Sequence, residues 1–100
     1  MAWSQWIAFN KIDIGTAPTS IGVYGLKHAG EVTFYGKAPG PDGIRGRLLE
    51  HLSGSEGDCT WSSNHYSFRE CDDPAQVLDR MIAIHVEEHG KPPRCNASDA

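Results

Sequence analysis

The chain has 100 residues, of which 39% are hydrophobic and 22% are charged, and its formal net charge is -4. A chain of this length folds as one domain, taken here as residues 1–100, which buries roughly two-thirds of its unfolded surface. The ordinary globular composition argues against disorder, a collagen-like chain and a disulfide scaffold, and the acidic balance argues against a protein that coats nucleic acid through bulk charge.

The N-terminal part of the chain predicts an arm followed by a β-hairpin. Residues 1–19 are too apolar for a free tail, so we expect a short helix or an extended arm that packs on the domain. Two β-prone runs follow at 21–26 and 31–36, and the short glycine-containing connection between them is typical of a hairpin. Because strand side chains alternate between faces, we expect Tyr24 to lie opposite Phe34 on one face.

A helix is predicted at residues 44–52. Ile44, Leu48 and Leu52 recur there at the spacing of one helical face. Gly54 follows where a left-handed residue commonly ends a helix. The polar stretch after this glycine is predicted to be a loop.

The C-terminal part predicts a third strand at residues 65–71 and a helix at 74–89. Asp73 is a good N-cap, Pro74 suits the first helical position, and Gly90 ends the helix. The order is therefore strand, strand, helix, strand, helix, preceded by the N-terminal arm or helix. We expect a small α/β sandwich of the α+β kind, with a sheet of about three strands covered by helices.

Cellular location and cysteine chemistry are predicted together. No apolar run reaches the roughly 20 residues of a membrane helix, and no secretory signal is recognisable. We therefore expect a cytoplasmic protein with no membrane partner. Three cysteines, Cys59, Cys71 and Cys95, are expected to be free thiols in that compartment. Their spacing does not favour a structural zinc site.

The charges are unevenly distributed along the chain. Residues 27–47 hold four basic residues against two acidic ones, whereas residues 50–88 hold nine acidic residues against two basic ones. The first segment is therefore the candidate for a local basic site on an acidic protein.

Four short motifs lie in this basic segment and on either side of it. They are Gly22-Val23-Tyr24, residues 34–37 (Phe-Tyr-Gly-Lys), residues 44–51 with Arg-Leu followed by His, and residues 92–96 with Pro-x-x-Asn. In this order they resemble the GIY-YIG nuclease domain, whose paired signature, first-helix pattern and C-terminal motif have this form. The resemblance spans residues 21–96 and implies a GIY-YIG-like fold.

The resemblance implies a metal-dependent endonuclease that hydrolyses phosphodiester bonds, with DNA as the expected partner and one Mg2+ or Mn2+ ion as the cofactor. Such hydrolysis needs a deprotonated water, neutralisation of charge on the phosphoryl oxygens, and help for the leaving oxygen. The alternative is a weakened or inactive module of the same fold that binds nucleic acid or a protein partner.

Four catalytic candidates follow from the resemblance. Tyr24 would act on the attacking water as a general base, and its phenol needs a nearby cation because its reference pKa is about 10. Lys37 would be that cation or would hold a phosphate. Arg47 would bind a phosphoryl oxygen through its planar donor fork. His51, one helical turn after Arg47, would orient the site or exchange protons.

The substrate-binding candidates include one departure from the family pattern. Phe34 stands where the second signature tyrosine is expected, so the ring is kept and the hydroxyl is lost. Tyr35 carries a hydroxyl, but strand alternation turns it to the opposite face. Arg45 and Asn96 complete this group, and Asn96 would fix the C-terminal loop or support the surroundings of the metal ion.

The metal ligand is the second departure, because the family expects a glutamate in the last helix. Counting from the start of that helix gives Asp79, which is one methylene shorter. Counting back from Pro93 gives Ile84, which cannot bind a metal ion. Glu87 and Glu88 are the remaining acidic residues there, and Asp79 is the candidate we retain.

Overall fold

The computed structural model describes residues 3–98 and shows the helices and strands of a small α+β protein. In chain order the elements are β1 (Ile7–Ala8), α1 (Lys11–Ile14), β2 (Gly22–His28), β3 (Glu31–Ala38), α2 (Gly43–Ser53), α3 (Asp58–Trp61), β4 (His65–Glu70), α4 (Pro74–His89) and α5 (Arg94–Ser98). The predicted α+β class is confirmed.

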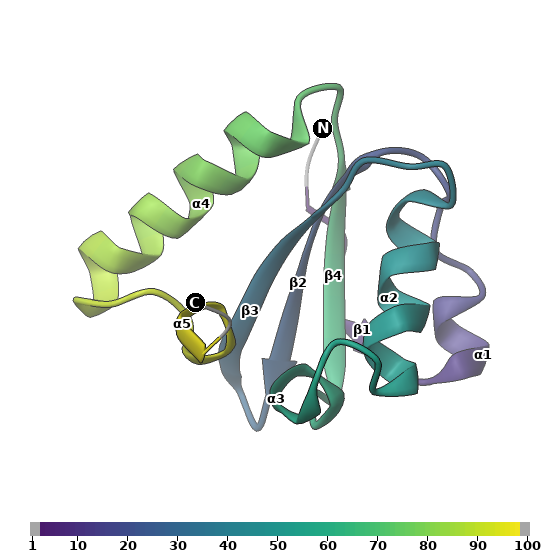
Figure 1. The fold of residues 1–100 in the computed structure, drawn as a ribbon, viewed down its shortest axis with the longest axis horizontal. Helices are drawn as coiled ribbons and strands as arrows, with labels where there is room; N and C mark the ends of the chain where they lie inside the picture. The colour runs from purple at the N-terminus through teal and green to yellow at the C-terminus, as the bar shows by residue number, and fades with distance from the viewer. Residues whose placement is uncertain (1–2, 99–100) are drawn as a thin grey trace.

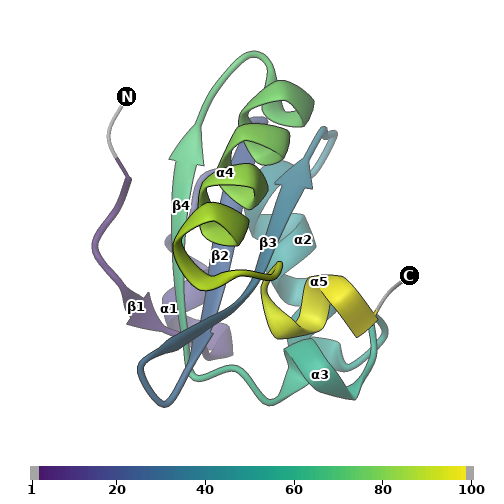
Figure 2. The ribbon, with the colours of Figure 1, turned by 90° about the vertical axis from the view of Figure 1, so that its left-hand side faces the viewer.

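An antiparallel sheet with the strand order β1-β4-β2-β3 forms the middle layer. α4 covers one face of this sheet, α1 and α2 cover the other, and α5 lies beside β3 and next to α3 (Figures 1 and 2). The described sheet has one strand more than expected, because the N-terminal arm adds β1 to the edge of β4. Ile7 lies opposite Tyr66 in that pairing.

The β2–β3 hairpin has a different register from the one predicted. Tyr24 lies opposite Gly36, and Leu26 lies opposite Phe34. The connection is only residues 29–30, both with positive φ, and a bulge follows Leu26 on the paired strands. The shorter loop and the bulge each move the pairing by one residue, so the expected Tyr24–Phe34 pair is wrong by two positions. The alternation is confirmed, because Tyr24 and Leu26 share the buried face.

The two longer helices lie where their sequence signals place them. α2 ends at Gly54 and α4 ends at Gly90, and both glycines are left-handed. The predicted loop after α2 instead contains α3, a single turn that has no amphipathic pattern to reveal it. No helix within residues 3–98 is both long enough and apolar enough to cross a membrane.

The core lies between the sheet and α2. Tyr24, Leu26 and Tyr66 point from the strands to this side, where Ile44 and Leu48 of α2 meet them, and all five are fully buried. α4 packs on the opposite face without a buried residue of its own. The well-packed side of the sheet therefore carries Tyr24.

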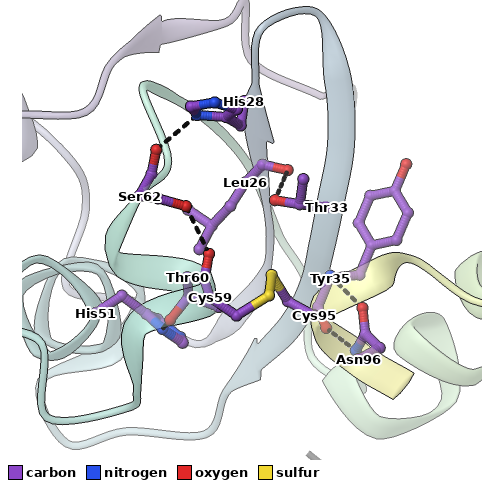
Figure 3. The surroundings of a disulfide bond; sticks show 10 residues. All are labelled: Leu26, His28, Thr33, Tyr35, His51, Cys59, Thr60, Ser62, Cys95 and Asn96. Carbon is purple, nitrogen blue, oxygen red and sulfur yellow. Dashed lines mark hydrogen bonds between the residues drawn. A yellow bond between two sulfur atoms is a disulfide. The ribbon is translucent and has the colours of Figure 1, made fainter. Parts of the chain in front are cut away.

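A disulfide bond joins Cys59 of α3 to Cys95 of α5 (Figure 3). The expectation of free thiols is therefore wrong for this pair, whereas Cys71 is a free thiol as expected. The two bonded residues are 36 positions apart in sequence, and only the tertiary fold brings their short helices together. Their spacing alone could not reveal the bond.

Candidate active site

A cleft of about 590 Å3 opens at the outer edge of β3, between α2 and the C-terminal helices. Six of the nine predicted site residues border it: Tyr24, Phe34, Tyr35, Lys37, Arg47 and Asn96. β3 is an edge strand, so among residues 3–98 no further strand pairs with its outer side. The structure therefore brings most of the motif residues to one concave surface.

Tyr24 and His51 form a buried hydrogen-bonded pair at the wall of the cleft. The Tyr24 hydroxyl lies 2.7 Å from His51 Nε2, and His51 Nδ1 lies 2.8 Å from Thr60 Oγ1. All three side chains are at most 2% exposed. The elements responsible are β2, α2 and α3, so the pair depends on the correct packing of all three.

The environment keeps both members of this pair neutral at pH 7. Burial raises the pKa of Tyr24 to about 12, and the nearby Arg47 charge offsets part of that rise. Burial and the same Arg47 charge lower the pKa of His51 to about 4. The neutral phenol therefore donates to His51 Nε2, and the remaining ring proton on Nδ1 is donated to Thr60.

Arg47 sits above the Tyr24 hydroxyl and is ion-paired with two carboxylates. Its Nη1 lies 3.0 Å from Glu50 Oε1, and its Nη2 lies 3.0 Å from Glu56 Oε1. Its positive charge also acts on the Tyr24 hydroxyl and lowers the pKa of that phenol against the effect of burial. A phosphate that enters the cleft would therefore compete with these carboxylates for the guanidinium group.

Gly36 creates the space in which the Tyr24 hydroxyl lies. A Cβ atom at this position would collide with the Tyr24 hydroxyl and with the Phe34 ring. Phe34 is 8% exposed and packs against His51, with ring centroids 5.1 Å apart. The missing hydroxyl of the second signature position is thus replaced by apolar packing around the imidazole.

Asn96 clamps the C-terminal segment to the edge of β3. The Tyr35 amide donates to Asn96 Oδ1 and the Asn96 amide donates to the Tyr35 carbonyl, both at 2.9 Å. The Tyr35 ring faces the α4 side, as strand alternation predicts, and contacts His85 there. Lys37 is exposed at the rim of the cleft. Asn96 therefore shapes the cleft through the backbone of β3.

Two predicted residues lie outside the cleft, and His51 lies behind Tyr24 rather than at the surface. Arg45 Nε donates to the carbonyl of Ala17 at 2.8 Å, which ties α2 to the segment after α1. Asp79 is exposed on α4, and its neighbour Leu78 borders the cleft instead. The predicted metal ligand is thus not assembled with the other site residues.

The carboxylates do not fit a metal centre in the cleft. Glu50 is the acidic residue that borders it, and Arg47 already holds its carboxylate. Within the described part of the chain, no group of three or more His, Cys, Asp or Glu side chains could hold a metal ion. We therefore derive no chemical step through a metal.

Sequence reasoning missed three residues of this site. Glu50 could have been found, because it follows Arg47 by one helical turn, where opposite charges meet. Glu56 and Thr60 lie beyond the end of α2, in a segment whose path only the folded chain defines. No local pattern marks them.

A larger hollow of about 840 Å3 lies between α4 and β3, on the other side of the edge strand. Trp3, Tyr35 and His85 contribute aromatic rings to it. Of the predicted site residues only Tyr35 borders this hollow. The motif residues thus single out the smaller cleft rather than the larger one.

No protein-family model, curated protein or solved structure matches the chain. The resemblance to the GIY-YIG nuclease domain therefore stays a prediction that rests on the motifs.

Proposed function

We propose that the cleft beside β3 binds a phosphodiester group and that the protein is an endonuclease acting on DNA. The observation that supports this most is the position of the Tyr24 hydroxyl, which contacts both Arg47 and His51 in a cleft with Lys37 at its rim. In this proposal Tyr24 and His51 accept a proton while Arg47 and Lys37 donate to the phosphoryl oxygens of one linkage. We retain the cytoplasm as the expected location.

The attacking water would lose its proton through Tyr24 to His51. As the water gives a proton to the Tyr24 oxygen, the phenol proton moves to His51 Nε2 along the existing 2.7 Å hydrogen bond. This relay requires no phenolate beforehand, which suits a tyrosine whose pKa is about 12. Thr60 holds the imidazole in the tautomer that leaves Nε2 free to accept.

Arg47 would stabilise the charge that develops on the phosphoryl oxygens. Its guanidinium exchanges a carboxylate partner for the phosphate, and Lys37 adds a second positive charge at the rim. Glu56, which pairs with the same guanidinium, raises the pKa of His51, whereas the Arg47 charge lowers it, so the exchange keeps a negative group beside Arg47 only if the phosphate takes the place of the carboxylate.

The resemblance predicts one Mg2+ or Mn2+ ion, and the catalytic steps above do not depend on it. When bound, such an ion neutralises phosphoryl oxygens and lowers the pKa of coordinated water. Asp79 lies outside the cleft, so its role as a ligand stays a prediction. Cleavage assays with and without the ion decide whether it is needed.

A binding module without catalysis is the second candidate. It is favoured by the two carboxylates that occupy the Arg47 fork and by the missing hydroxyl at Phe34. In that case the cleft recognises DNA or an acidic protein partner and leaves the linkage intact.

Nicking of supercoiled plasmid and of branched DNA, with Mg2+ or Mn2+, tests the proposal. We expect wild-type protein to cut, and Tyr24→Phe and Arg47→Ala to lose activity by about 100-fold or more, the range of general acid–base and charge stabilisation. Tyr66→Phe is the matched control, because its buried hydroxyl bonds the Asp13 carbonyl at 2.9 Å, away from the cleft. It should cut like wild type.

Each alternative has its own outcome in these assays. Equal cleavage by wild type, Tyr24→Phe and Arg47→Ala would indicate a contaminating nuclease and end the proposal. Salt-sensitive DNA binding without cleavage would support the binding module. No DNA binding even at low salt would point to a protein partner.

A further inference from the structure

The Cys59–Cys95 disulfide connects two short segments. In each segment, the residue that follows the cysteine makes a contact in the candidate site. Thr60 follows Cys59, and its Oγ1 holds His51 Nδ1 at 2.8 Å. Asn96 follows Cys95, and its side chain makes both hydrogen bonds to the Tyr35 backbone. Figure 3 shows the bond between these two contacts, with His51 on one side and Tyr35 on the other.

The segments on either side of this bond are too short to hold their own positions. α3 has four residues and α5 has five, whereas an isolated helix needs about 12–15 residues to be even marginally stable in water. Cys95 and Thr60 are buried, so the covalent link anchors both segments in the interior. Without the link, α5 depends mainly on the Asn96 clamp and on its packing against β3.

We propose that this disulfide positions Thr60 and Asn96 and thereby acts as a redox switch of the cleft. In the oxidised protein the imidazole of His51 and the edge of β3 are both held in place. Reduction frees α5 from α3, so the Asn96 clamp on β3 opens and Thr60 no longer fixes the His51 ring. The sheet and α2 keep their fold, because Cys95 is only one member of a core that otherwise consists mainly of side chains from the strands, α1 and α2.

The reductant is a dithiol, either a small molecule or a protein. Its thiolate attacks Sγ of Cys59, which is half-buried where Cys95 is fully buried, and the S–S bond breaks. The Cys95 thiolate leaves and takes up a proton. The second thiol of the reductant then displaces Cys59, so that two protein thiols and one reductant disulfide result. An oxidised dithiol reverses both steps.

Amide hydrogen exchange and 15N NMR of oxidised and reduced protein test this positioning directly. On reduction we expect the Tyr35 amide to exchange at least tenfold faster and the His51 ring nitrogens to shift toward a mixture of tautomers. The amides of β2 and β4 should keep their protection. Both measurements need no enzymatic activity, so they test the role of the disulfide even if the protein does not cut DNA.

Two cysteine variants separate the disulfide from general thiol effects. The double variant Cys59→Ser, Cys95→Ser should show the Tyr35 exchange and His51 shifts of reduced wild type. Adding the reductant should not change them. Cys71→Ser, which removes the free thiol, should respond to the reductant like wild type. The effect on cleavage rests on the proposed function, and there we expect at least a tenfold lower rate in the reduced state.

Two results would overturn the inference. Unchanged Tyr35 exchange and unchanged His51 nitrogens after complete reduction would mean that the bond positions neither contact. Loss of protection in β2 and β4 together with Tyr35 would mean that the bond only stabilises the whole fold.

Discussion

The buried contact between Tyr24 and His51 determines the protonation chemistry at the scale of single residues. Each side chain has its pKa moved away from neutrality by burial, in the direction that preserves its uncharged form. The contact is therefore a hydrogen bond between two neutral groups at pH 7.

The shifted pKa of His51 predicts a loss of stability in acid. Its folded pKa of about 4 lies below the usual 6.5, so the unfolded chain binds the proton first as the pH falls through this interval. The contribution is fully present above pH 6.5, and we expect the free energy of unfolding to fall by about 2 kcal/mol between pH 7 and pH 5. Urea unfolding at the two pH values measures it.

His51→Gln should remove this part of the pH dependence, whereas His65→Gln, at an exposed position, should keep it. The same slope in wild type and His51→Gln would contradict the assignment. At the alkaline end the raised pKa of Tyr24 has the opposite sign of dependence, and stability should fall as the pH rises from 10 to about 12.

The carboxylate partners of Arg47 predict a variant with stronger DNA binding. Glu56→Gln removes one charge that competes with phosphate for the guanidinium. We expect DNA affinity to rise roughly two- to fivefold, because a partly exposed ion pair contributes about 0.5–1 kcal/mol. Fluorescence anisotropy with a labelled duplex measures it.

Glu87→Gln on α4 is the matched control for this experiment, since it changes the net charge equally at an exposed position. If both variants raise the affinity equally, the gain comes from net charge and the competition at Arg47 is disproved.

The elements differ in how well their sequence signals predicted them. α2 and α4 each end at a left-handed glycine, as the sequence predicts, whereas Asp73 occupies the N-cap of α4 without a capping hydrogen bond from its side chain. α3 and β1 are four and two residues long, and each exists only through a tertiary partner. The β2–β3 hairpin was predicted only in part, because the sequence indicates the two strands and their turn but not the bulge.

The C-terminal helix α5 predicts a local effect of removing the Asn96 clamp. Asn96→Ala deletes two hydrogen bonds to the edge of β3, and we expect a destabilisation of about 1–2 kcal/mol with faster exchange at the Tyr35 amide. Asn64→Ala, at an exposed position before β4, is the control and should change neither. Unaltered Tyr35 exchange in Asn96→Ala would show that packing alone holds α5.

At the scale of the whole molecule, the motifs predicted which residues come together but not which contacts these residues make. Tyr24, Arg47 and His51 come together because hairpin, alternation and helical spacing each constrain them locally. The position of Asp79 depends on the angle at which α4 crosses the sheet, and the Cys59–Cys95 bond depends on two distant turns meeting. No short segment of the sequence could predict either the position of Asp79 or the Cys59–Cys95 bond.

The edge strand β3 separates the two hollows of the molecule, so a bound ligand can be located on one side of this strand or on the other. The cleft on the α2 side holds the motif residues, while the larger hollow under α4 holds aromatic rings. We expect a ligand that carries phosphodiester groups to bind in the cleft on the α2 side and not in the hollow under α4.

The most direct measurement is a titration of 15N-labelled protein with a short DNA duplex at low salt, followed by amide and guanidinium chemical shifts. The account predicts that the largest changes occur at Gly36, Lys37 and Arg47, along the β3 edge and the facing side of α2. Changes concentrated around His85 in the hollow under α4, or no changes at all, would contradict it.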